Sequence, residues 1–204
     1  MKYHDLKHRL EALVVFTLRD VFLLDPDFRQ ATLYDWEKLG KVVRLKNGCY
    51  TFSDLIPVNF DFYLLANLIY EPSYVSTEMA LNHYGVIPEL VSSVTCVTTN
   101  KTQVFANSFG NFVYQTITPA LFFGYDLLEV REHGVKIASL EKAVLDYLYF
   151  NSSVVSNDDF SGLRWNKQIL NEGIDKVKLN TFLAIFANAA LAKRVTGFYK
   201  YLET

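Results

Sequence analysis

The chain has 204 residues, a length that suits one large domain or two small ones and allows a buried core. Half of the residues are hydrophobic and 15% are aromatic, which excludes a mainly disordered protein. The formal net charge of −2 excludes a polycation that coats nucleic acid by charge alone. Two cysteines without a CxxC motif exclude a disulfide-stapled scaffold.

A cytoplasmic protein is expected. Residues 1–9 mix charges where an export signal carries an apolar core. Two long uncharged stretches, residues 102–125 and 179–192, are respectively too polar and too short to span a membrane. The charge is unevenly distributed, because residues 1–50 hold two more basic than acidic side chains while the remainder is net acidic.

Three helices are predicted before residue 41. Apolar residues at helical spacing indicate the first over residues 3–15, and Thr17 with Asp20 forms a capping-box pattern before a second that ends near Leu24. The third runs to Leu39 from Phe28 or from residues 31–32, and Gly40 follows at the position of a left-handed C-terminal residue. Its predicted buried stripe is Leu33, Trp36 and Leu39, with Thr32 and Phe28 beside it, and its outward face is Gln30, Ala31, Tyr34 and Lys38.

A β-hairpin is predicted over residues 41–52, because Asn47-Gly48 lies between two alternating runs and favours a type I′ turn. A two-residue loop would pair Leu45 with Tyr50 and Val43 with Phe52. These four apolar side chains would form one face of the hairpin. The opposite face would be basic and polar, with Arg44, Lys46 and Thr51.

Three short helices followed by a hairpin are typical of a winged helix-turn-helix domain, whose third helix enters the DNA major groove. The expected fold is therefore α+β, with this domain over residues 1–53, a connecting helix within 54–71 and a mixed α/β domain over 72–204. The alternative is an ordinary docking domain whose polar face is only solvated. The candidate DNA-binding residues are Arg29, Gln30, Tyr34, Lys38, Lys41, Arg44, Lys46 and Asn47.

Beyond residue 53 the pattern alternates between helix and strand. Helices are predicted over residues 60–70, from Ser76 or Thr77 to 84 and over 140–150, and the C-terminus is mostly helical. Strands are predicted over residues 94–99, 103–106 and 112–117, and a second hairpin, 127–131 with 135–138, turns at His133-Gly134.

Catalytic motifs are not recognised in the sequence, and no enzyme activity, metal or cofactor is expected. His4 and His8 share a helix face without a further ligand nearby. His83 and His133 stand beside glycines, where capping or solvation accounts for them. Lys142 and Asp146 form an i, i+4 pair, which favours a charged, solvated helix face over a nuclease-like carboxylate and lysine. Cys96 is expected to be buried in a strand.

Three segments carry a resemblance to a known family. Residues 72–89 resemble the pattern P-S-Y-[IV]-S-x-E-x-A-L-x-x-x-G-[LIV]-I-P-E of AbiEi-type antitoxins of type IV toxin–antitoxin systems. Residues 94–101 resemble the V-T-x-V-T-T-x-K strand of that family, and residues 138–146 its A-x-x-E-K-A-[LV]-x-D helix. The similarity covers about residues 14–150 with the segments in the family order.

The resemblance implies a phage-defence regulator that binds double-stranded DNA repeats in its own promoter and opposes a nucleotidyltransferase-like toxin. Direct contact with that toxin is left open. The family's basic hairpin pattern R-x-x-R-G-x-Y is incomplete here, because Asn47 replaces the second arginine. The alternative function is a protein-interaction module that docks a partner through the winged domain and an aromatic groove containing Phe109, Phe112, Phe122, Phe123 and Tyr125.

Overall fold

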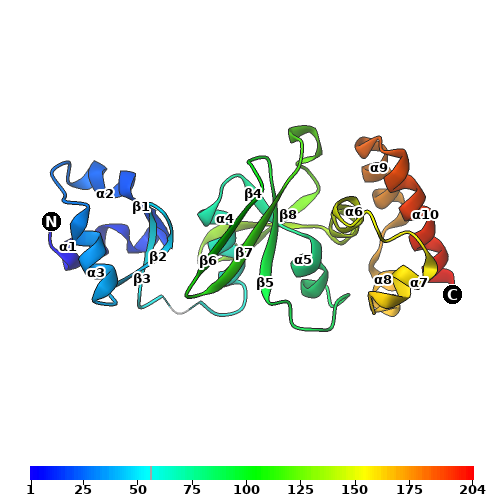
Figure 1. The fold of residues 1–204 in the computed structure, drawn as a ribbon, viewed down its shortest axis with the longest axis horizontal. Helices are drawn as coiled ribbons and strands as arrows, with labels where there is room; N and C mark the ends of the chain where they lie inside the picture. Colours follow the sequence, from blue (N-terminus) through cyan, green and yellow to red (C-terminus); the bar gives the residue numbers. More distant parts are fainter. Residues whose placement is uncertain (56) are drawn as a thin grey trace.

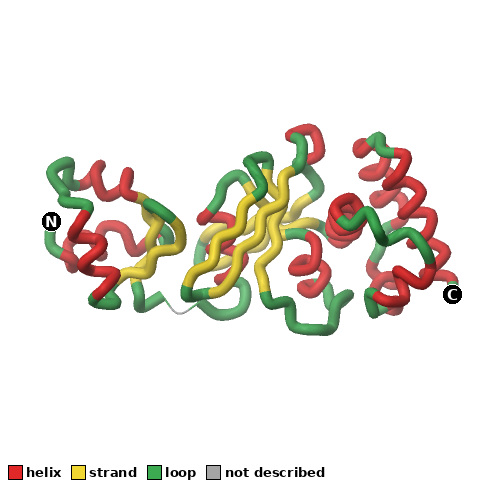
Figure 2. Tube along the Cα trace, viewed as in Figure 1, coloured by secondary structure: helices red, strands yellow, loops and turns green. Residues whose placement is uncertain are grey.

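The computed structural model describes residues 1–55 and 57–204 and has an α+β architecture (Figure 1). We call residues 1–55 the head and residues 57–204 the body. Figure 2 shows a head of helices and short strands, then a sheet with helices beside it, and a cluster of helices at the C-terminal end. Within the described ranges, no helix combines the length and the apolar character needed to cross a lipid bilayer.

The head contains three α-helices and a three-stranded sheet of order β1-β3-β2. Its elements are α1 (Tyr3–Leu10), the 3₁₀ helix η1 (Glu11–Leu13), β1 (Phe16–Thr17), α2 (Leu18–Leu24), α3 (Ala31–Lys38), β2 (Val42–Lys46) and β3 (Cys49–Phe52). The helices and one face of the sheet enclose a small core that includes Leu6, Phe16, Leu33 and Trp36. The first helix, predicted over residues 3–15, ends as an α-helix at Leu10 and continues as η1 to Leu13, where Val14 with its positive φ of 63° ends it.

Local signals in the head set the helix ends. The Thr17 side chain accepts a hydrogen bond from the Asp20 amide, and the Asp20 carboxylate accepts one from the Thr17 amide, so the predicted capping box is confirmed. Gly40, with φ +65°, follows α3 in the left-handed conformation that glycine favours. Leu39 is 68% exposed, so its predicted place in the buried stripe is wrong, because α3 ends at Lys38 and the helical spacing ends with it.

The β2–β3 hairpin forms at the predicted place with a different register. Arg44 pairs with Tyr50, and Val42 with Phe52, while a β-bulge lies between Arg44 and Lys46. Among the turn residues Gly48 has a positive φ of 72°, whereas a type I′ turn requires one at Asn47 as well. The predicted pairs Leu45–Tyr50 and Val43–Phe52 are therefore wrong by one residue, since the bulge absorbs the shift.

The body is built on a six-stranded mixed sheet of order β6-β7-β5-β4-β9-β8. The pairs β5–β7 and β4–β9 are parallel, and the remaining neighbours are antiparallel. The strands are β4 (Ser73–Val75), β5 (Ser93–Thr98), β6 (Gln103–Asn107), β7 (Gly110–Thr116), β8 (Tyr125–Val130) and β9 (His133–Ala138). The β8–β9 turn lies at Arg131-Glu132, which both have positive φ, and not at His133-Gly134 as predicted.

Helices cover both faces of this sheet. The helix α4 (Asp61–Ile69) packs on β4 and β9, and its apolar side chains join the core of the body. On the other face lie α5 (Thr77–His83) and α6 (Leu140–Phe150), which pack against each other. The Ser139 side chain caps α6, as predicted, by accepting a hydrogen bond from the Lys142 amide.

The C-terminal helices enclose the outer side of α6 (Figure 1). They are α7 (Asn157–Gly162), α8 (Lys167–Gly173), α9 (Lys176–Phe186) and α10 (Ala189–Glu203). A short 3₁₀ helix outside this cluster, η2 (Pro119–Leu121), precedes β8. The helix α6 therefore runs between the sheet and this cluster, with apolar groups on all sides.

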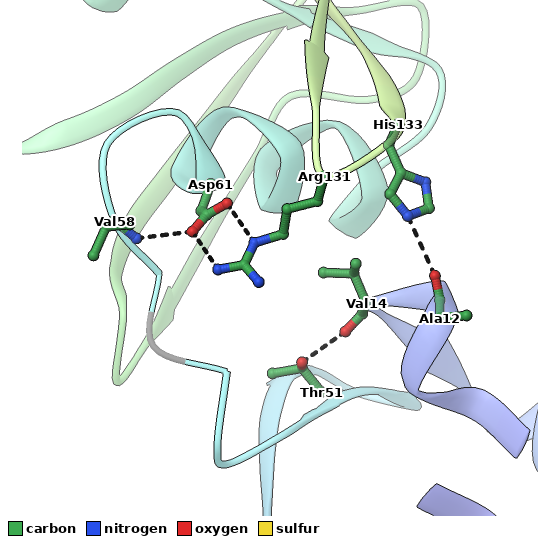
Figure 3. Close-up of polar contacts among 7 residues, drawn as sticks. All are labelled: Ala12, Val14, Thr51, Val58, Asp61, Arg131 and His133. Carbon is green, nitrogen blue, oxygen red and sulfur yellow. Dashed lines mark hydrogen bonds and ion pairs between the residues drawn. The ribbon is translucent and has the colours of Figure 1, made fainter. Parts of the chain in front are cut away.

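The head and the body meet along an apolar seam. Leu45 and Cys49, on the hairpin, are 1% and 2% exposed and belong to the core of the body, not to that of the head. A polar contact crosses the seam (Figure 3), because His133 Nε2 bonds the Ala12 carbonyl at 3.2 Å. Beside it, within the head, Thr51 Oγ1 donates to the Val14 carbonyl at 2.6 Å. The hairpin is thus packed on both faces.

A bidentate ion pair supports the body side of this seam. Arg131, in the β8–β9 turn, donates from Nε and Nη2 to the two carboxylate oxygens of Asp61 at 2.7 and 2.8 Å (Figure 3). Asp61 also accepts from the Val58 amide and is 6% exposed. The guanidinium lowers the pKa of the Asp61 carboxyl, although burial opposes the shift.

Candidate nucleic-acid interface

The helix α3 exposes a polar face. Leu33 and Trp36 point into the head core, so the opposite arc faces solvent, and Tyr34 and Lys38 on it are exposed. Gln30 is the N-terminal cap residue of α3, and it and Arg29 before it are also exposed. Hydrogen-bonding, aromatic and cationic groups therefore line one side of a helix that is anchored by its apolar side.

Two cations flank the Tyr34 ring. Lys38 Nζ lies 5.9 Å and Arg44 Cζ 5.7 Å from the ring centroid, so the face of α3 is continuous with strand β2. Arg44 Nε also lies 3.4 Å from Glu37 Oε1. This acidic partner neutralises part of the charge of Arg44, whereas Lys38 has no ion-pair partner among the described residues.

The other candidate DNA-binding residues lie around the Tyr34 ring and its two cations. Lys41 is exposed, and its ammonium lies 5.2 Å from the centroid of the Tyr3 ring on α1. Asn47, at the hairpin turn, is exposed as well. Asp35 is exposed on α3, so the face carries acidic as well as basic groups.

Lys46 differs from the other candidates because it lies against the body. Its ammonium is 5.2 Å from the centroid of the Tyr70 ring and 5.4 Å from that of Phe105. Beside it, Asn107 Nδ2 donates to the Leu45 carbonyl at 3.2 Å, and a cleft of about 470 Å³ separates the hairpin from the turn after β6. Thus Lys46 is only half-exposed.

The predicted basic face of the hairpin requires a correction. Thr51, which was expected to point outward with Arg44 and Lys46, is 1% exposed and is bonded to the Val14 carbonyl. In the observed register Thr51 pairs with Val43, on the face that packs on the body, whereas Arg44 pairs with Tyr50 on the opposite face. Arg44 alone of these three side chains is exposed.

The aromatic residues considered for a docking groove are mainly core residues. Phe112 is fully buried in β7, and the other four, Phe109, Phe122, Phe123 and Tyr125, are half-buried and packed against the core of the body. Phe122 and Tyr125 meet Tyr74 at centroid distances of 5.0 and 5.4 Å. Phe109 lines a cavity of the body, whereas Phe123 lies against the Lys142 ammonium.

A buried ionic network lies at the centre of the body. Lys142 and Asp146 form the predicted i, i+4 ion pair, but both are fully buried, so the expectation of a solvated helix face is wrong. The Lys142 ammonium donates to the Tyr74 hydroxyl at 2.7 Å, and this hydroxyl donates to Asp146 at 2.9 Å. The Ser76 hydroxyl donates to the same carboxylate at 2.8 Å, so it does not cap α5.

Burial lowers the pKa of the Lys142 ammonium and raises that of the Asp146 carboxyl, while the charge of each opposes the shift of the other. The network joins β4 to α6, and its side chains are buried away from solvent. This arrangement suits a structural role. The signal that predicts its burial is the apolar character of α6 on every side, with Ala143, Val144 and Leu148 fully buried around it.

The histidines and cysteines have structural surroundings. His83 is half-buried among aromatic rings, and His133 bonds the head, so neither is explained by capping or solvation alone. Cys96 is buried in β5 as predicted, and burial raises the pKa of its thiol. The described part of the chain holds no group of three or more potential metal ligands.

No protein-family model matches the chain, and no curated protein is significantly similar to it.

Proposed function

We propose that the protein is a cytoplasmic DNA-binding regulator whose head is a winged helix-turn-helix domain. The order of elements supports this proposal, because α2 and α3 follow β1 and lead directly into the β2–β3 hairpin. The single observation that carries it is the exposed face of α3. Its apolar side is held in the head core while Gln30, Tyr34 and Lys38 face solvent.

The chemistry of this face matches the edges and backbone of duplex DNA. The Gln30 amide has both a donor and an acceptor, as an adenine edge requires, and Lys38 can donate to guanine acceptors in the major groove. Arg29, Lys41 and Arg44 lie around α3, where they would contact phosphates and set the position of the helix. From the hairpin turn Asn47 would contact the DNA, because the Lys46 side chain is engaged with Tyr70 and Phe105.

We further propose that the DNA is the promoter of the protein's own gene and that the body opposes a nucleotidyltransferase-like toxin. This part rests on the resemblance of residues 72–89, 94–101 and 138–146 to AbiEi-type antitoxins. Two of these segments meet in the structure, because Tyr74 and Ser76 bond Asp146. The shared pattern would then preserve the core of the body. Co-expression with a toxin of this class tests the proposal: growth should be rescued by the full chain.

Fluorescence anisotropy with labelled DNA from upstream of the gene tests the DNA-binding proposal. The three cations placed at phosphates, Arg29, Lys41 and Arg44, give an expected slope of log affinity against log salt of about −3, if each neutralises one phosphate. Lys41→Ala should weaken binding and reduce the magnitude of the slope by about 1.

Lys200→Ala is the matched control, because Lys200 is an exposed lysine in the last turn of α10, in the C-terminal helix cluster. It should leave both the affinity and the slope unchanged. Weak binding that does not depend on DNA sequence at moderate salt, or equal losses in the two variants, would contradict the proposal. That result would favour a domain that docks a protein partner.

A further inference from the structure

A cavity of about 550 Å³ lies at the end of the body sheet where α4 begins and α5 ends. The start of β5 and the turn before β7 complete its wall. Its volume falls in the range of small-molecule sites, which is about 300–1,000 Å³. None of the candidate DNA-binding residues lines it, so the cavity has no part in the function proposed above.

Aromatic rings form one side of this cavity. Phe60 and Tyr63 come from the start of α4 and Phe109 from the turn before β7. The His83 ring, at the end of α5, meets the rings of Phe60 and Tyr63 edge-on at centroid distances of 5.3 and 5.9 Å. Phe60 is 42% exposed, so much of its ring remains uncovered.

Hydrogen-bonding groups in the cavity lack protein partners. Tyr63 is 7% exposed, and its hydroxyl bonds no other group of the described residues. The His83 ring nitrogens also bond no other group of these residues, and burial lowers the pKa of this imidazole, which favours its neutral form. Neither the Tyr63 hydroxyl nor the His83 nitrogens are among the buried atoms that lack a partner in the described residues, so these groups are accessible and free to bind a ligand.

The rim of the cavity is polar and uncharged. Ser93 and Asn111 are neighbours in the parallel β5–β7 pair, and Ser92 stands next to them. Their hydroxyl and amide groups can both donate and accept hydrogen bonds. The lining residues include no Asp, Glu, Lys or Arg, so a charged ligand would lose its hydration without gaining an ionic partner.

We propose that this cavity binds a free nucleoside. A nucleoside combines the two chemical features of the wall, since its planar base suits the aromatic side and its sugar hydroxyls suit the rim of Ser92, Ser93 and Asn111. The Tyr63 hydroxyl and the His83 imidazole hydrogen-bond the edge of the base. An unphosphorylated ligand fits because no cation lines the site.

Isothermal titration calorimetry of the full chain with adenosine and cytidine tests this assignment. At least one of them should bind with a Kd below about 1 mM. AMP should bind no more tightly than adenosine, and N-acetyltryptophanamide, an uncharged aromatic without a sugar, should bind at least tenfold more weakly. No binding of either nucleoside at 10 mM, tighter binding of AMP, or equal binding of the tryptophan derivative would overturn the proposal.

Two variants locate the binding. Ser92→Trp, at an exposed position on the rim, should fill the cavity and abolish nucleoside binding while thermal unfolding stays that of the wild type. Tyr63→Phe removes only the hydroxyl and should weaken binding about two- to tenfold, as expected for one hydrogen bond.

The matched control is Ser153→Trp, because Ser153 is an exposed serine in the turn after α6 and does not line the cavity. It introduces the same side chain and should leave nucleoside binding unchanged. Nucleoside binding retained by Ser92→Trp would exclude this cavity as the site.

Discussion

Replacing Lys142 by Met is the perturbation that tests the buried network most directly. The substitution keeps an unbranched side chain of similar length but leaves the Asp146 carboxylate buried without its cation. Lys142 and Asp146 are both 0% exposed, so solvent cannot take over the lost interaction. Breaking a buried ion pair by removing one partner costs about 3–5 kcal/mol of unfolding free energy.

For a chain of this size, 1 kcal/mol corresponds to about 2–4 °C in the midpoint of thermal unfolding, so Lys142→Met should lower it by about 6–20 °C. Urea unfolding followed by circular dichroism gives the free energy, and thermal scans give the midpoint. The double variant Lys142→Met/Asp146→Leu should recover part of the loss, since no charge is then buried alone. Recovery is incomplete because the Tyr74 and Ser76 hydroxyls lose the carboxylate that accepts from them.

Lys193→Met provides the matched control, because Lys193 is an exposed lysine on α10 and the same substitution there should change stability by less than about 0.5 kcal/mol. A loss below about 1 kcal/mol for Lys142→Met would refute the reasoning, since the cost of an unpaired buried charge is several times larger. Such a result would mean that water reaches the pair in solution.

Three further predictions concern the head, the seam and the candidate interface. Thr17→Ala should destabilise the protein by about 1 kcal/mol through loss of the capping box, measured by urea unfolding, and an unchanged stability would contradict that role. Arg131→Gln should destabilise the protein by about 1–2 kcal/mol at pH 7, because Arg131 is 45% exposed and solvent screens part of its pair with the buried Asp61. Since the folded pKa of Asp61 is lowered, the difference from wild type should persist above the unfolded pKa near 4 and shrink at lower pH. Stability curves from pH 2 to 7 check this sign, and a difference that grows toward acid would be inconsistent with it. Arg44→Ala should reduce the magnitude of the salt slope for DNA binding by about 1. Lys46→Ala should change this slope less, because the Lys46 ammonium lies on two aromatic rings of the body. The reverse order of the two effects in anisotropy titrations would argue against this placement.

Short-range patterns predicted much of the chain correctly. The capping box of Thr17 and Asp20, the glycine after α3 and the Ser139 cap of α6 all involve groups only a few residues apart. The exposed positions of Tyr34 and Lys38 follow in the same way, because helical periodicity and two buried anchors orient α3. Such features depend on the local backbone and on which side is apolar.

Features that depend on distant segments were predicted less well. Periodicity marks Thr51 as outward-facing, but the body covers that side of the hairpin. The same reasoning places Lys142 and Asp146 on a solvated face, although the C-terminal helices and β4 enclose them. The β2–β3 register also differs, since alternation alone does not reveal the bulge between Arg44 and Lys46.

By itself the sequence determined the type and order of most elements, the anchored and exposed sides of α3, and the absence of recognisable catalytic motifs. Only the tertiary structure decided that Lys46 lies on Tyr70 and Phe105, that Lys142 meets Tyr74 and that Tyr63 and His83 share a cavity. The physical reason is that burial of a polar group is settled by which distant surfaces exclude water from it. That exclusion arises from packing between elements that are far apart in the chain.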